Sequence, residues 1–81
     1  FNPETTIRYQ LPEAGRVTLT IYNLLGQKVR TLVNQNRSAG SYMVVWDGRD
    51  DAGEIAPSGL YFYRLSVNGR VAATRKTLLM R

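Results

Sequence analysis

The 81-residue sequence contains no cysteine and no histidine. The missing cysteine excludes a disulfide framework and thiolate chemistry. The missing histidine removes the commonest general base and the commonest transition-metal ligand, so the serines have no histidine to activate them. The sequence also lacks a glycine-rich phosphate loop. We therefore predict that the chain is not an enzyme and that it needs no cofactor.

Long hydrophobic runs are absent as well, so we expect no membrane span. No signal peptide is present, and the sequence starts at Phe1 rather than at methionine. We expect residues 1–81 to be one small domain cut from a longer secreted protein. Hydrophobic residues make up 43% of the chain, which is enough for a single core, so disorder is not expected.

Acidic residues are scarce, and none follows Glu54. Up to that point acidic and basic residues cancel, so the net charge of +5 belongs to the last third of the chain. Such an asymmetry can mark a polyanion-binding face. It can also come from Arg and Lys on the solvent side of strands, where they protect edges from pairing. We favour the second interpretation and predict no nucleic-acid partner, because aromatic residues do not interleave the final charges.

What is present is the alternation of β-strands. Apolar and polar residues alternate over residues 5–11, 16–23 and 60–67, and again after the Asn68–Gly69 pair, the strongest hairpin signal in the chain. We expect a shorter strand over residues 27–33, a polar loop over 34–40, and a strand over 41–47 that is apolar on both faces and lies near the middle of the fold. These features predict an all-β protein: a small antiparallel immunoglobulin-like β-sandwich of six to seven strands with Trp46 in its core.

The segment "WDGRDDAGE", residues 46–54, gathers four carboxylates behind the single tryptophan. A calcium site using Asp47, Asp50 and Asp51 is one interpretation, but the spacing does not fit an EF-hand loop and Arg49 weakens the field. The other interpretation is a pair of turns in which Asp side chains accept backbone N–H bonds, and we favour it. We therefore predict no metal site.

The five tyrosines offer two further interpretations. Tyr61 or Tyr63 could form a tyrosine corner, in which the hydroxyl bonds to nearby backbone. Alternatively, an exposed strip could stack on sugars, which requires two or more aromatic residues on one sheet face. That strip would have to come from Tyr9, Tyr22, Tyr42 and the strand at 60–67.

The order of several motifs resembles a known family. "FNPETTIRY" (1–9), "YNLLGQKV" (22–29), "WDGRDDAG" (46–53) and "SGLYFYRL" (58–65) are followed by the basic end "TRKTLLMR" (74–81). Together they resemble the C-terminal sorting domain of the type IX (Por) secretion system. They are also similar to the related immunoglobulin-like module of flagellar hook-capping proteins.

The sorting resemblance implies a C-terminal secretion and cell-surface signal of Gram-negative bacteria. Its partners would be an outer-membrane translocon, a sortase-like protease and a covalently linked N-terminal cargo. The location would be the periplasm in transit, then the outer-membrane surface or the medium. Carried onto this sequence, the family's glycine and strand motifs fall on Gly40 and Tyr42 and on the expected sorting signal: Gly59, Tyr61, Lys76, Thr77, Leu78, Leu79 and Met80. The alternatives are an accessory carbohydrate- or surface-binding module and a hook-capping-type assembly domain.

Overall fold

The chain forms six antiparallel strands and, over the described residues 4–80, no helix. This is a computed structural model. Residues 1–3 and 81 lie outside the description, and with them the first three residues of the "FNPETTIRY" motif and the last residue of the basic end. The strands are β1 (Thr5–Leu11), β2 (Gly15–Tyr22), β3 (Lys28–Arg37), β4 (Gly40–Trp46), β5 (Gly59–Val67) and β6 (Arg70–Leu79). The predicted all-β immunoglobulin-like sandwich is confirmed, with six strands.

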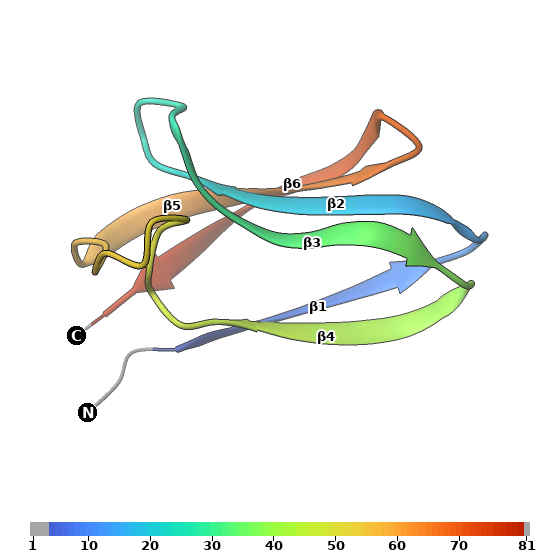
Figure 1. Ribbon diagram of the computed structural model, residues 1–81, viewed down its shortest axis with the longest axis horizontal. Helices are drawn as coiled ribbons and strands as arrows, with labels where there is room; N and C mark the ends of the chain where they lie inside the picture. Colours follow the sequence, from blue (N-terminus) through green and yellow to red (C-terminus); the bar gives the residue numbers. More distant parts are fainter. Residues whose placement is uncertain (1–3, 81) are drawn as a thin grey trace.

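The strands form two sheets that face each other (Figure 1). The smaller sheet pairs β1 with β4, and the larger has the order β3-β2-β5-β6. Side chains on the facing surfaces of the two sheets form the core. Each sheet therefore also has an outer face, which points away from the core. The molecule measures 35 × 25 × 21 Å.

The core is built by the alternation that the sequence predicts. Inward positions of β1 and β2 are 8% exposed or less, while their neighbours mostly face solvent. Trp46 is fully buried, and its ring meets the Tyr61 ring edge-on with 5.0 Å between centroids. Each large apolar side chain removed from water stabilises the fold by about 1.5–3 kcal/mol. The buried apolar set is Ile7, Tyr9, Leu11, Val17, Leu19, Ile21, Val33, Trp46, Ala56, Tyr61, Leu65 and Leu79.

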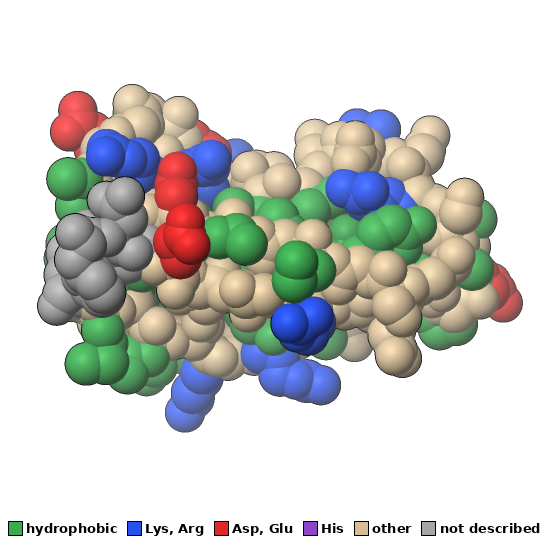
Figure 2. Space-filling model, turned by 90° about the horizontal axis from the view of Figure 1, so that it is seen from below, with side chains coloured by type: hydrophobic (Ala, Val, Ile, Leu, Met, Phe, Trp, Pro, Cys, Tyr) green, Lys and Arg blue, Asp and Glu red, His purple; other side chains and the backbone are tan. Residues whose placement is uncertain are grey.

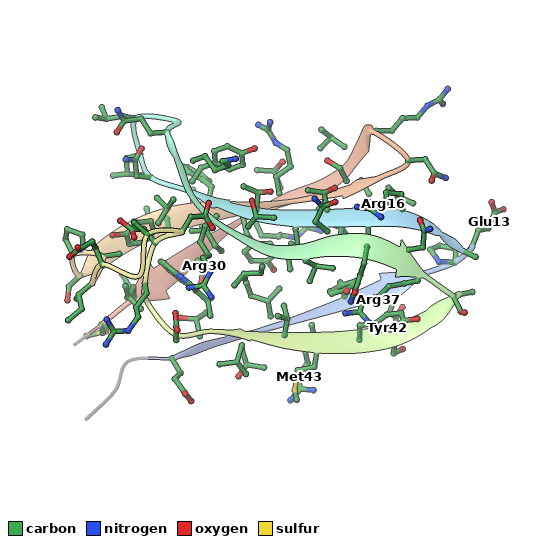
Figure 3. The ribbon with its side chains drawn as sticks, viewed as in Figure 1. Glu13, Arg16, Arg30, Arg37, Tyr42 and Met43 are labelled. Carbon is green, nitrogen blue, oxygen red and sulfur yellow. The ribbon has the colours of Figure 1, made fainter. Side chains whose placement is uncertain are left out.

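The expectation that residues 41–47 form a central, doubly buried strand is wrong. β4 belongs to the two-stranded sheet, whose outer face is covered by no other described element. Met43 and Val45 are 58% and 42% exposed on that face, and Met43 points away from the sandwich (Figure 3). Hydrophobic side chains reach the surface there between polar ones (Figure 2). The apolar pattern of β4 therefore reflects an outer surface as well as a core.

The expected polar loop over residues 34–40 is also corrected. β3 continues to Arg37, with Asn34 opposite Thr18 and Gln35 opposite Val17. The long β2 strand supplies backbone partners over its whole length, and these ladder bonds outweigh the low strand preference of asparagine.

The turn between β5 and β6 is the predicted two-residue turn. Asn68 and Gly69 have φ values of 53° and 79°, as a type I′ turn requires. Asn68 also fastens this turn to β2. Its N–H donates to the Arg16 carbonyl at 2.8 Å, and its Oδ1 accepts from the Arg16 N–H at 2.9 Å.

Candidate functional site

The acidic segment after β4 is held by hydrogen bonds from its own backbone and from β3. Asp47 Oδ1 accepts from the Arg49 N–H at 3.0 Å and from Arg30 Nη1 at 3.1 Å. Trp46 Nε1 donates to the Arg49 carbonyl at 2.9 Å, so the buried indole has a partner. Arg30 points from β3 toward this segment (Figure 3) and also donates to the Arg49 carbonyl at 3.2 Å.

The next two carboxylates have structural roles of the same kind. Asp50 Oδ1 accepts from the N–H groups of Ala52 and Glu54, both at 2.9 Å. Asp51 Oδ1 accepts from the Thr31 N–H at 3.0 Å, and its own N–H donates to the Val29 carbonyl at 2.9 Å. The prediction that aspartates in this segment accept backbone N–H bonds is therefore confirmed. Within residues 4–80, no three acidic side chains gather as a metal ion would require.

The five-residue loop at Asp50 is built a second time at Asn23, between β2 and β3. Asn23 Oδ1 accepts from the N–H groups of Leu25 and Gln27, both at 3.0 Å. In both loops the first residue also exchanges backbone bonds with the fourth and fifth, and the fourth is a glycine. The shared five-residue pattern is Asn or Asp, then two positions at which the loops differ, then Gly, then Gln or Glu. The sequence analysis predicted turns in the acidic segment but did not identify the equivalent loop at Asn23.

A second structural motif is repeated at the starts of β4 and β5. Gly40 and Gly59 have φ values of 151° and 152°, a conformation that favours glycine, and a tyrosine follows two residues later in each case. The Tyr42 hydroxyl donates to the Ser38 carbonyl at 2.6 Å, and the Tyr61 hydroxyl to the Pro57 carbonyl at 2.5 Å. The tyrosine corner predicted for Tyr61 or Tyr63 is thus found at Tyr61, and Tyr42 forms an unpredicted equivalent.

The residues expected to carry a sorting signal lie at different depths. Gly59 and Tyr61 begin β5, and Tyr61 is in the core. On β6, Leu79 is 1% exposed and Thr77 is half-buried, whereas Lys76 and Leu78 face solvent. Met80 follows the strand and is 66% exposed. These seven residues therefore do not form one continuous surface.

The outer face of the larger sheet carries a row of residues that the sequence analysis missed. Lys28 lies opposite Tyr22, Tyr22 opposite Phe62, and Phe62 opposite Lys76, so the row crosses all four strands. We call Lys28, Tyr22, Phe62 and Lys76 the aromatic row. The Arg64 guanidinium lies 5.1 Å from the centre of the Tyr22 ring. A hollow of about 310 Å³ opens beside the row and is lined by Tyr22, Asn23, Leu24, Gly26, Phe62, Arg64 and Thr74.

A sugar-binding strip needs aromatic faces that are free to stack. Tyr22 and Phe62 share one sheet face, but both are half-buried and Arg64 covers the Tyr22 ring. Tyr9 and Tyr42 stack on each other at 5.4 Å. Arg37 lies 4.9 Å from the Tyr42 ring, beside it in Figure 3. The rings proposed for sugar stacking are therefore largely occupied by the protein's own groups.

Comparison with known proteins gives a consistent result. A profile of the FlgD Ig-like domain matches residues 2–71. Among solved structures, FlgD from Pseudomonas aeruginosa superposes with a TM-score of 0.69 at 25% identity, over 94% of this chain and 61% of that one. FlgD from Xanthomonas campestris, whose structure is described as giving insights into the hook capping essential for flagellar assembly, superposes with a TM-score of 0.73 at 24% identity, over 96% of this chain and 55% of that one. No curated protein matches.

These findings correct the functional interpretation drawn from the motif order. The type IX sorting signal, its translocon and its sortase-like protease are contradicted, because both the profile and the solved structures point to FlgD. The error has a physical origin. The quoted motifs encode strand starts, tight loops and a tyrosine corner, which any sandwich of this topology can share. The chain spans about three fifths of the solved FlgD chains or less. It belongs to the FlgD Ig-like domain family.

Proposed function

We propose that this domain is a non-catalytic assembly module of the hook-capping type, which acts by making protein–protein contacts. The observation that carries the proposal is the match to the FlgD Ig-like domain over residues 2–71. The X. campestris protein of the same fold is described as a hook-capping protein. An assembly role requires a stable scaffold with exposed faces, and the sandwich offers two such faces.

The side chains support a non-catalytic role. The sequence has no histidine, and Asp47, Asp50 and Asp51 all accept hydrogen bonds that shape their own segment. A general acid or base must reach a substrate from within a cleft. Among residues 4–80, every carboxylate except that of Asp50 is exposed. Asp50 is half-buried and lines a hollow beside Lys28, but its Oδ1 already accepts two backbone N–H bonds.

A domain exchange tests the proposal. In X. campestris lacking its own FlgD, the Ig-like portion of FlgD would be replaced by residues 1–81. The matched control would carry an unrelated immunoglobulin-like sandwich of similar size at the same junctions. We expect the first chimera to restore hooks, counted by electron microscopy, and swimming to a measurable fraction of wild type. If both chimeras accumulate to equal levels and both leave cells without hooks, the proposal is wrong.

A further inference from the structure

The charged side chains on the strands of the larger sheet are all positive. Its strands contain no aspartate or glutamate. They carry eight basic residues: Arg16, Lys28, Arg30, Arg37, Arg64, Arg70, Arg75 and Lys76. Both ion pairs found among residues 4–80 involve Arg30, which points toward the smaller sheet. On the outer face, Lys28, Arg64 and Lys76 therefore have no ion-paired carboxylate within the described part of the chain, and their combined field attracts anions.

The end of this face nearest the β2–β3 loop carries exposed apolar side chains. Leu60 and Leu78 lie opposite each other next to the aromatic row and are 37% and 55% exposed. Leu24 is 62% exposed and lines the hollow together with Tyr22 and Phe62. Exposed apolar residues grouped in this way and rimmed by polar residues mark an interaction site. Tyr22, Phe62 and Arg64 are also of the residue types enriched at protein interfaces.

We infer that this face docks an acidic amphipathic segment of a partner protein. The inference rests on the proposed assembly function. The segment's carboxylates pair with Lys28, Arg64 and Lys76, and an apolar side chain enters the hollow beside Phe62. Four strands place Lys28 and Lys76 three strand spacings apart, roughly 14 Å. That width accommodates one helix of about 10–12 Å diameter.

Other occupants fit less well. A second copy of this chain carries a net charge of +5, so two copies repel each other. In the acidic segment of such a copy, Asp47, Asp50 and Asp51 already accept internal bonds, which a basic partner would have to compete with. A flat lipid surface would not reach the hollow, which lies between the β2–β3 loop and the sheet. Nucleic acid would require a longer basic track than two flanking lysines and one arginine.

The test uses the whole 81-residue chain, labelled with ¹⁵N, and a synthetic helical peptide as probe. The peptide would carry leucines at spacings of three and four residues and glutamates elsewhere. We expect its addition to shift the amide signals of Tyr22, Phe62, Arg64 and Lys76. The double variant Arg64→Glu/Lys76→Glu should weaken binding by tenfold or more. The matched control, Arg8→Glu/Arg70→Glu, makes the same change in net charge away from this face and should weaken binding less than threefold.

Several outcomes would overturn the inference. One is equal loss of affinity in the two double variants while both keep dispersed, folded spectra. Another is unchanged binding of a peptide whose glutamates are replaced by glutamine. A third is no response to the peptide but a response of the same face to phosphatidylglycerol vesicles or duplex DNA, which would assign the face to lipid or nucleic acid. Because the assay involves no flagellum, peptide binding without hook rescue would refute the proposed function alone, and rescue without binding would refute this inference alone.

Discussion

At the residue scale, glycine and tyrosine act together at the starts of β4 and β5. Gly40 and Gly59 supply a positive φ that turns the chain into each strand. The tyrosine two positions later closes the corner by donating to a carbonyl four residues before it. The two corners differ in burial. Tyr61 is 5% exposed and packs on Trp46, whereas the Tyr42 hydroxyl bond is exposed.

This difference in burial predicts that removing the hydroxyl group lowers the free energy of unfolding by unequal amounts at the two tyrosines. Tyr61→Phe should lower the free energy of unfolding by about 1–2 kcal/mol, because the partner carbonyl loses its donor in a place that water reaches poorly. Tyr42→Phe should cost less than about 0.5 kcal/mol, since water can replace the hydroxyl. Urea denaturation followed by Trp46 fluorescence measures both. Equal costs would show that burial does not set the value of these bonds.

The two matched loops allow a second residue-scale prediction. Asp50 and Asn23 use the same atom, Oδ1, to accept two N–H bonds. Asp50→Asn should therefore change the free energy of unfolding by less than about 0.5 kcal/mol, whereas Asp50→Ala should cost about 1–2 kcal/mol through the two lost acceptors. The same denaturation assay distinguishes them. A large loss in the asparagine variant would instead point to a role for the negative charge.

At the element scale, alternation predicted where strands begin and which residues they bury. Ile7, Leu19 and Leu65 are buried as their patterns indicate, and the Asn68–Gly69 turn has the expected conformation. These features are local in sequence, so a single sequence contains them. The polar end of β3 and the exposed side of β4 were misjudged. Their environment depends on which strands lie beside them, and residue pattern alone does not report that.

The aromatic row shows the same limit for the candidate site. Tyr22 and Phe62 are 40 positions apart in the sequence and become neighbours only through the pairing of β2 with β5. Lys28 and Lys76 join the row through two further strand pairs. The basic excess of the last third was visible in the sequence. That two of its members, Arg64 and Lys76, share the outer face with Lys28 required the register.

Because the outer face of β4 is exposed, replacing a valine by threonine should cost less stability there than in the core. Val45→Thr, at a side chain 42% exposed, should change the free energy of unfolding by less than about 0.5 kcal/mol. Val17→Thr, at a fully buried side chain, should cost about 1–3 kcal/mol because its hydroxyl would enter the core without a partner. Thermal and urea unfolding of both variants provide the comparison. A costly Val45→Thr would mean that the outer face of β4 is covered in solution.

At the scale of the whole molecule, acidic and basic groups are separated. All six acidic residues lie outside the strands, in the segment before β1, the β1–β2 turn and the connection after β4. The strands of the larger sheet keep the positive charge. This arrangement lets the domain carry an attractive field for acidic partners while its like charges oppose association between copies.

The separation of charge predicts the association state of the isolated domain. At low salt we expect a monomer of 9.2 kDa by sedimentation velocity up to about 0.1 mM, because copies with a charge of +5 repel over a long Debye length. Arg64→Glu/Lys76→Glu lowers the charge by four, to +1, and places acids beside the exposed leucines of the outer face. We expect that variant to associate more than wild type. We also expect it to associate more than Arg8→Glu/Arg70→Glu, although the two variants have the same net charge. A wild-type dimer at low salt that dissociates as salt is added would contradict this expectation. It would mean that the acidic connection of one copy binds the basic sheet of another.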